Sequence, residues 1–143
     1  MRVEFKKESN AMNAIVKKLG LKPDMKALVV AAPAGYLKSL APLPEAVVVS
    51  EAVAGTHEFV QFFATRKSEI DKSAKKLLQS AAPGALVWIT YPKKTSGVES
   101  DLSREAVWAA MERTGWRPVS QIAIDEVWSA LRFRPTEDVK PRK

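Results

Sequence analysis

Hydrophobic residues follow two alternating patterns along the chain, short continuous runs and stripes at helical spacing. The continuous runs cover residues 28–30, 46–49, 58–63 and 85–91. Turn-forming or charged residues flank each run, and short apolar runs bounded in this way are typical of strands buried on both faces. We therefore predict four core strands at these positions.

The helical stripes predict three helices, over residues 11–21, 67–82 and 103–114, and one or two helical turns at 36–40. A glycine ends the first and the third of these helices, as is common at helix C-termini. The central helix carries the clearest apolar stripe, with polar and charged residues on its other face.

Short polar side chains near the helix starts indicate how the helices are capped. Ser68 and Asp71 have the spacing of a capping box, so we predict that they cap the central helix. Ser100 and Asp101 precede the third helix, and we predict that they cap it.

The last apolar segment, residues 117–135, has the pattern of two strands folded back at Asp125 and Glu126. Strands that alternate with amphipathic helices predict a three-layer α/β fold with a mostly parallel, Rossmann-like sheet, ending here in an antiparallel hairpin. We expect one domain over residues 11–135, preceded by a polar N-terminal segment (1–10) and followed by a charged C-terminal tail (136–143).

Composition excludes several kinds of chemistry. The chain has 143 residues, the size of one domain, and no cysteine, so disulfides, thiolate nucleophiles and cysteine-containing zinc sites are excluded. His57 is the only histidine and lies in a turn-like segment, where we predict an ordinary loop residue and no metal site. The charged N-terminus and the lack of a run of ~20 apolar residues lead us to expect a cytoplasmic protein without a membrane partner.

Basic residues outnumber acidic ones, with 23 lysines and arginines against 16 aspartates and glutamates, a net charge of +7. Such an excess attracts polyanions, and nucleic-acid binding stays open on charge alone. The basic residues are spread along the chain, however, which is also the pattern of an ordinary solvated surface.

Three segments near the C-terminus, AAPGALVWITYPK, SGVESDLSREAVW and AIDEVWSALRF, occur in an order that resembles an uncharacterised bacterial family, domain of unknown function 3052. The segments KKLGLKP and APAGYL also resemble it. The most distinctive residues of this resemblance are Ile124, Asp125, Trp128, Ser129, Leu131 and Arg132.

Members of that family resemble trimmed class I S-adenosylmethionine (SAM) dependent methyltransferases, so the resemblance implies a methyltransferase-like sheet of seven strands and no established activity. Only residues 51–57 separate the second and third apolar runs. Eight residue steps span at most ~27 Å, barely enough to cross back along a sheet without a helix. We therefore predict that one strand-helix unit is missing.

The loop after the first strand, APAG, lacks the closely spaced glycines that let a backbone approach a nucleotide-like cofactor. We expect its backbone to crowd an adenosyl ligand and expect no cofactor, with SAM as the alternative. For that alternative the candidate cofactor-binding residues are Ala34, Gly35 and Tyr36 in this loop, and Glu51 after the second strand, where methyltransferases hold ribose hydroxyls. An exposed glutamate at a strand end is the plainer interpretation of Glu51.

The loop YPKKTSGVESD after the fourth strand contains the ingredients of an anion site. Lys93 and Lys94 supply charge, Thr95 and Ser96 supply hydroxyls, and Gly97 allows a turn of backbone amides. The same residue types also make an ordinary solvated turn, and both interpretations stay open.

Alternation along the hairpin places Trp128 and Arg132 on one face, where they are candidates for stacking against a ligand. The alternative is that Trp128 packs beneath helix 103–114 and that Arg132 pairs with a carboxylate such as Asp125.

These residues lead to a functional hypothesis. We expect a degenerate, non-catalytic methyltransferase-like domain that binds an anionic small molecule or a macromolecular partner, such as a protein. The alternative is an active SAM-dependent methyltransferase with an atypical cofactor loop. No catalytic residue is assigned, and a cleft between Pro33, Glu51 and Lys93 is the expected binding region.

Overall fold

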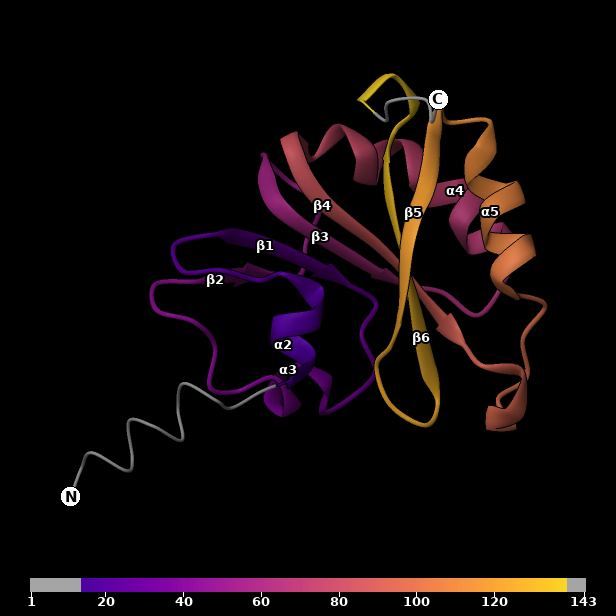
Figure 1. Cartoon of the computed structure of the whole chain (residues 1–143), viewed down its shortest axis with the longest axis horizontal. Coiled ribbons are helices and arrows are strands. Elements are labelled where there is room, and N and C mark those ends of the chain that lie inside the picture. The colour runs from indigo at the N-terminus through magenta and orange to yellow at the C-terminus, as the bar shows by residue number, and fades with distance from the viewer. Residues whose placement is uncertain (1–13, 139–143) are drawn as a thin grey trace.

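The computed structural model describes residues 14–138, which form one six-stranded sheet in the order β2-β1-β3-β4-β6-β5 (Figure 1). The four strands from β2 to β4 in that order pair in parallel, and β6 and β5 complete the sheet as antiparallel neighbours. The strands are β1 (Lys26–Val30), β2 (Val48–Ser50), β3 (His57–Phe63), β4 (Ala81–Pro92), β5 (Trp116–Ala123) and β6 (Trp128–Pro135). The predicted three-layer α/β fold with a terminal hairpin is confirmed.

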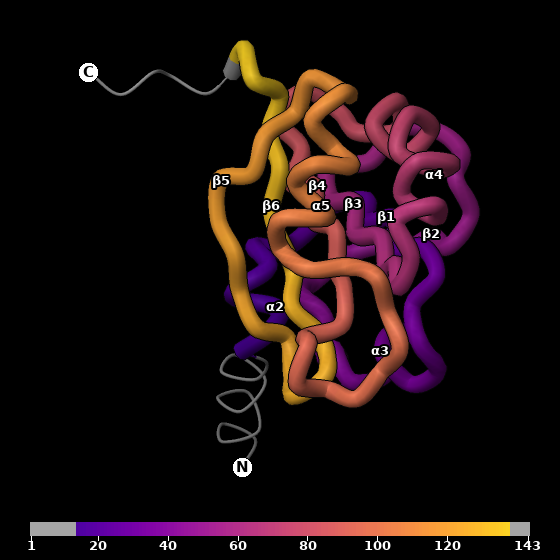
Figure 2. The backbone as a smooth tube through the Cα atoms, turned by 90° about the vertical axis from the view of Figure 1, so that its right-hand side faces the viewer, coloured from indigo at the N-terminus to yellow at the C-terminus, as the bar shows by residue number. Residues whose placement is uncertain are grey.

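Helices cover both faces of the sheet, and Figure 2 shows α2 and α4 on opposite sides of the strands. The helices are α2 (Ala14–Leu19), α3 (Tyr36–Ser39), α4 (Lys67–Gln79) and α5 (Arg104–Glu112), with 3-10 turns η1 (Lys94–Ser96) and η2 (Thr136–Asp138). None of the helices in the described part of the chain is long and apolar enough to cross a membrane. The predicted polar segment 1–10 and the end of the predicted tail lie outside the described residues.

The core consists of two apolar clusters, one on each face of the sheet. Strand β3 contributes to both, because Phe59 and Phe63 point toward α2 and α3 whereas Val60 and Phe62 point toward α4 and α5. On the α2 face the indole Nε1 of Trp88 donates a hydrogen bond of 3.0 Å to the carbonyl of Leu19. A strand that is buried on both faces explains the continuous apolar run in its sequence.

The predicted loss of a strand-helix unit is confirmed by the short edge of the sheet. Strand β2 has three residues and no helix follows it before β3 begins at His57. The side chain of Val48 on this edge is 63% exposed.

A series of buried side-chain hydrogen bonds links three elements on the α2 face. The hydroxyl of Tyr36 donates to Oε1 of Gln61 (3.0 Å), and Nε2 of Gln61 donates to Oγ1 of Thr90 (3.0 Å). All three side chains are buried. These hydrogen bonds join the start of α3 to strands β3 and β4. Both polar atoms of the Gln61 side chain have a partner in them.

The start of β4 differs from the sequence-based prediction. The strand begins at Ala81, so Pro83 and Gly84 lie inside it as an irregularity in the pairing with β3 and not in a separate turn. His57, predicted as a loop residue, is the buried first residue of β3, because its amide donates to the carbonyl of Ser80 at 2.7 Å. Long-range pairing with the β4 segment therefore draws this residue into the sheet.

The predicted helix caps are wrong. Ser68 and Asp71 lie inside α4, whose N-cap is Arg66. Ser100 and Asp101 bond to Thr65 and to the start of α4 instead of capping α5. At the start of α4, Oε1 of Glu69 accepts from the amides of Thr65 and Arg66, and Oδ1 of Asp101 accepts from the amide of Lys67 at 2.8 Å. Ser103 caps α5 by accepting from Ala106. The loop after β4 folds back over α4, so Asp101 caps the preceding helix in the chain and not the following one.

We predict that Asp101→Ala lowers the free energy of unfolding by about 1 kcal/mol, because it removes a helix-capping acceptor. Glu99→Ala is the matched control in the same loop. Its carboxylate lies 3.9 Å from Arg66 and both side chains are exposed, so its removal is expected to change stability by less than ~0.5 kcal/mol. Urea unfolding of the two variants measures the difference, and equal effects would contradict the assigned cap.

Burial raises the pKa of Tyr36 to about 12, from an ordinary value of 10.0. Between these pH values the unfolded chain releases the phenolic proton while the folded chain keeps it, so the free energy of unfolding falls as the pH rises from 10 toward 12. The loss amounts to roughly 3 kcal/mol at most.

The direct measurement is a tyrosinate absorbance titration of Tyr91→Phe, which leaves Tyr36 as the sole tyrosine. We expect its midpoint well above pH 10, and a midpoint at 10 in the folded protein would refute the buried assignment. In Tyr36→Phe the corresponding part of the alkaline stability loss is expected to disappear.

Candidate functional site

A crevice opens at the carboxyl ends of β1 and β3, where the chain changes direction across the sheet. The connection after β1 carries α3 on one face, and the connection after β3 carries α4 on the other. Such topological switch points are where open α/β sheets bind ligands. The pocket here has a volume of about 410 Å³ and is lined by Ala31, Phe62, Phe63, Ala64, Thr65, Glu69, Lys72, Ser73 and Trp128. We call it the switch-point crevice.

Aromatic rings stiffen one wall of the crevice. The ring of Phe63 meets Trp128 edge to face, with centroids 5.1 Å apart, and meets Tyr36 in the same way at 4.6 Å. Each such contact contributes roughly 0.5–1.5 kcal/mol beyond area burial. The half-buried indole of Trp128 is therefore held in place before any ligand arrives.

The interpretation that Trp128 packs beneath helix 103–114 is wrong. The indole packs in the cluster on the α2 and α3 face, across the sheet from α5. The predicted face of the hairpin is nevertheless correct, because Trp128 and Ala130 share this cluster while Leu131 and Phe133 lie in the other.

The crevice has one charged group that is free to meet a ligand. Oε1 of Glu69 accepts from two backbone amides at the start of α4. Lys72 is exposed and makes no ion pair within residues 14–138. The lining therefore offers a cation and two hydroxyls, from Thr65 and Ser73, but no second carboxylate or imidazole for acid-base chemistry.

The first loop contributes to the site through Ala31. Ala31 has a left-handed backbone with φ 63°, a conformation that costs a residue with a side chain roughly 1–2 kcal/mol, and Gly35 has φ 84°. A Cβ atom added at Gly35 would meet no atom within 4 Å, so the expected backbone crowding is not found at this position. Ala34 and Gly35 are exposed.

Tyr36 and Glu51, the other predicted cofactor-binding residues, do not line the crevice. The ring of Tyr36 is buried with its hydroxyl bonded to Gln61, and its amide donates to the carbonyl of Pro33. Glu51 is exposed in the loop after β2. None of the four candidate cofactor-binding residues lines the crevice, and Glu51 lies in a different loop from Ala34, Gly35 and Tyr36.

The loop after β4 surrounds a second pocket of about 360 Å³. Its lining residues are Pro92, Lys93, Lys94, Val98, Ser100, Asp101, Leu102 and Ser103. The predicted Lys93 and Lys94 belong to it, whereas Thr95, Ser96 and Gly97 do not. Neither Pro33 nor Glu51 lines it, so these residues and Lys93 do not share this pocket.

Most polar groups of this loop are used to hold it in place. Oγ of Ser96 accepts from the amide of Val98, Oγ of Ser100 donates to the carbonyl of Thr65, and Asp101 caps α4. The turn at Gly97 is left-handed with φ 86°. The loop therefore fastens the start of α4 and leaves the two lysines as its remaining candidates for an anion.

Arg132 lies on the same face of β6 as Trp128 but outside the crevice, since four strand residues place them about 13 Å apart. Its predicted pairing with Asp125 is wrong, because Oδ1 of Asp125 accepts from the amides of Val127 and Trp128 and shapes the hairpin turn. Burial, followed by the nearby charge of Arg134, lowers the pKa of Arg132.

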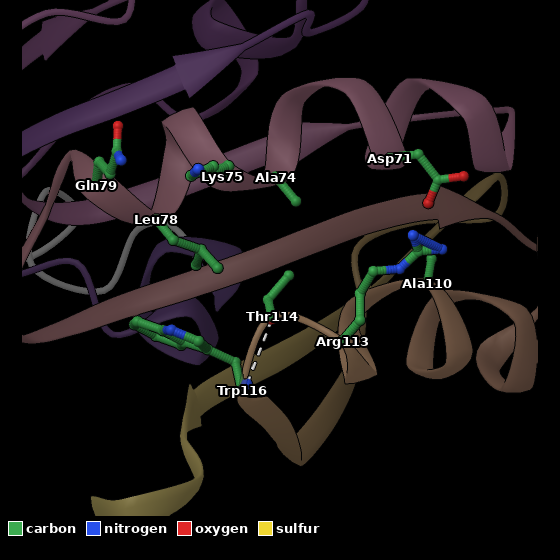
Figure 3. Close-up of a pocket in the computed structure, with 9 residues that line it drawn as sticks. All are labelled: Asp71, Ala74, Lys75, Leu78, Gln79, Ala110, Arg113, Thr114 and Trp116. Carbon is green, nitrogen blue, oxygen red and sulfur yellow. Dashed lines mark hydrogen bonds between the residues drawn. The ribbon is translucent and has the colours of Figure 1, made fainter.

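A larger groove, about 510 Å³, runs between α4 and α5 (Figure 3). In Figure 3 the side chain of Arg113 extends toward Asp71, and Leu78 and Trp116 lie at the other end. Gln79, the last residue of α4, also lines the groove, as does Thr114, which follows the end of α5. The groove therefore lies along the helix layer and not at the carboxyl edge of the sheet.

Sequence reasoning missed most of the crevice. Phe63, Ala64 and Thr65 are the end of a predicted strand and the residues after it, so their position at the carboxyl edge was a usable signal. Lys72 and Ser73 had no such signal, because they follow the first turn of a helix whose rotation about its axis depends on packing.

Solved methyltransferase structures resemble this chain over nearly its whole length. A SAM-dependent methyltransferase from Aquifex aeolicus matches with a TM-score of 0.66 and 18% identity, over 93% of this chain and 97% of that chain. The DhpI complex with S-adenosylhomocysteine (SAH) matches with a TM-score of 0.60 and 15% identity, over 94% and 89%. Magnesium protoporphyrin IX methyltransferase (ChlM) from Synechocystis PCC 6803 matches with a TM-score of 0.55 and 9% identity, over 92% and 83%.

No protein-family model and no curated protein sequence matches the chain. Membership in domain of unknown function 3052 therefore stays a prediction. Identities this low show the fold alone, and on that ground the chain has a methyltransferase-like, Rossmann-like fold.

Proposed function

We propose that this chain is a non-catalytic, methyltransferase-like binding domain whose switch-point crevice holds a small ligand with an aromatic or apolar part and a negative charge. One observation carries the proposal: the crevice sets a fixed aromatic wall, Phe63 and Trp128, beside the unpaired Lys72. Concave, mostly apolar sites with a few polar groups are typical of small-molecule binding.

The non-catalytic part of the proposal rests on the chemistry of the lining. Glu69 is its single carboxylate and caps α4, and the lining contains no histidine or cysteine. Such a site can bind and orient a ligand but offers no evident proton acceptor. We also propose that the protein is bacterial and related to domain of unknown function 3052, which the segment from Ile124 to Arg132 supports. The lack of cysteine supports a cytoplasmic location.

An active SAM-dependent methyltransferase is the second candidate. The comparison with the Aquifex enzyme favours it, because the two chains match over almost their entire lengths, and DhpI carries SAH on the same fold. Backbone contacts to the cofactor would then come from Ala34 and Gly35, since the amide of Tyr36 is already bonded, and Glu51 would hold the ribose.

The first test uses 8-anilinonaphthalene-1-sulfonate, which combines apolar rings with one sulfonate, as a fluorescent probe. Lys72→Gln is expected to weaken its binding by about three- to tenfold, the loss of one charge-assisted contact. Lys76→Gln removes the same charge from an exposed position on the same helix and is expected to leave binding unchanged. Equal binding by both variants would refute the assignment of Lys72.

Calorimetry with SAM and SAH separates the two candidates. We expect no micromolar affinity for either compound if the domain is a binder of another ligand. Micromolar affinity that falls in Glu51→Gln, but not in the exposed control Glu99→Gln, would replace the first proposal with the second.

A further inference from the structure

Three arginines share one face of the β5–β6 strand pair. Arg117 lies directly opposite Arg134 in the antiparallel pairing, and Arg132 follows on the same face of β6, opposite Ser120. Residues two apart on a strand are separated by about 6.6–6.8 Å, and directly opposed residues are closer still. We call these three residues the arginine face; they lie on the α2 side of the sheet, because Arg132 pairs with Trp88 of the α2-side cluster.

The positive charges of this arrangement repel one another, and a bound anion would reduce the repulsion. Like charges opposite one another on a sheet destabilise it, and none of the three arginines forms an ion pair within residues 14–138. Nε of Arg132 is buried and has no hydrogen-bond partner there either. A buried donor without a partner usually has a functional or structural reason.

Neighbouring residues extend the positive charge. The carbonyl of Leu19, which accepts from Trp88, places the end of α2 beside the position of Arg132. Lys17 and Lys18, both exposed, lie in the last turn of that helix. The net charge of +7 would attract a polyanion to this surface from a distance.

We propose that the arginine face binds the phosphate backbone of a nucleic acid. Arg117 is exposed and Arg132 and Arg134 are half-buried, and none of the three lines the switch-point crevice, the loop pocket or the groove between α4 and α5. An extended row of cations without a pocket suits a chain of phosphates better than a single small anion.

A membrane surface is the less suitable partner, because the arginine face has no large exposed apolar residue to insert. Within residues 14–138 the large exposed apolar side chains are Val48, Val53, Val98, Trp108 and Val119. Trp108 and Val119 line a separate pocket with Arg104 at the start of α5, and Val48 is on the far edge strand. Phosphate contacts also imply binding that does not depend on nucleotide sequence.

The test measures fluorescence anisotropy of a labelled, mixed-sequence single-stranded oligonucleotide with the full chain over a range of salt concentrations. The variant R117Q/R132Q/R134Q is compared with R66Q/R104Q/R113Q, which removes three exposed arginines elsewhere and gives the same net charge. Arginine-face substitution is expected to weaken binding at low salt at least tenfold. It is also expected to reduce the slope of log affinity against log salt by about 2, at ~0.7 per lost contact.

The control variant is expected to keep the wild-type slope within experimental error. Equal loss in the two variants would show that net charge alone binds the oligonucleotide and would overturn the proposal, as would the absence of binding by the wild-type chain at low salt. Binding of vesicles that contain phosphatidylserine, lost in the arginine-face variant while oligonucleotides do not bind, would also overturn it in favour of a membrane.

Circular dichroism and the thermal midpoint check that the variants fold. The arginine-face variant is expected to melt no lower than the wild type, because it removes like-charge repulsion. If the triple variant does not fold, R117Q/R134Q is measured against R104Q/R113Q, and the expected change in slope is then about 1.4.

Discussion

Burial of strand β3 on both faces is the constraint on which the rest of the structure depends. Six of its seven residues are buried, and only Glu58 is exposed. A strand in this position needs a helical layer on each side, since one layer alone would leave half of its apolar side chains in water. The connections after β1 and β3 therefore run to opposite faces, and the switch-point crevice opens where they diverge.

Polar groups in the interior are satisfied where they define this geometry. The side-chain hydrogen bonds from Tyr36 to Gln61 and from Gln61 to Thr90, each 3.0 Å long, join the first loop to strands β3 and β4. A buried side-chain amide of Gln61 without partners would be costly, so these hydrogen bonds favour one arrangement of the loop over others. Two buried side-chain nitrogen atoms in the described part of the chain have no hydrogen-bond partner, Nδ1 of His57 and Nε of Arg132.

Strand β6 connects two surfaces of different chemistry. Its first residue, Trp128, completes the aromatic wall of the crevice, whereas Arg132 and Arg134, farther along the same strand, belong to the arginine face. The two surfaces share no residue, so each can be altered without touching the other. The methyltransferase-like fold therefore holds the switch-point crevice and the arginine face at separate places along one strand.

The local pattern of the sequence determined the elements and the class of the fold. Runs of apolar residues located β1, β3 and most of β4, helical stripes located α4 and α5, and alternation assigned the two faces of the hairpin correctly. These properties depend on neighbours within a few residues, so they can be derived without knowing the partners.

Only the tertiary structure decided what the loops and the helix surfaces contact. Asp101 caps a helix that begins 34 residues earlier, and His57 enters the core because the β4 segment pairs with it. Lys72 reaches the crevice because packing sets the rotation of α4. Such contacts join residues far apart in the chain, and no local periodicity encodes which of them will meet.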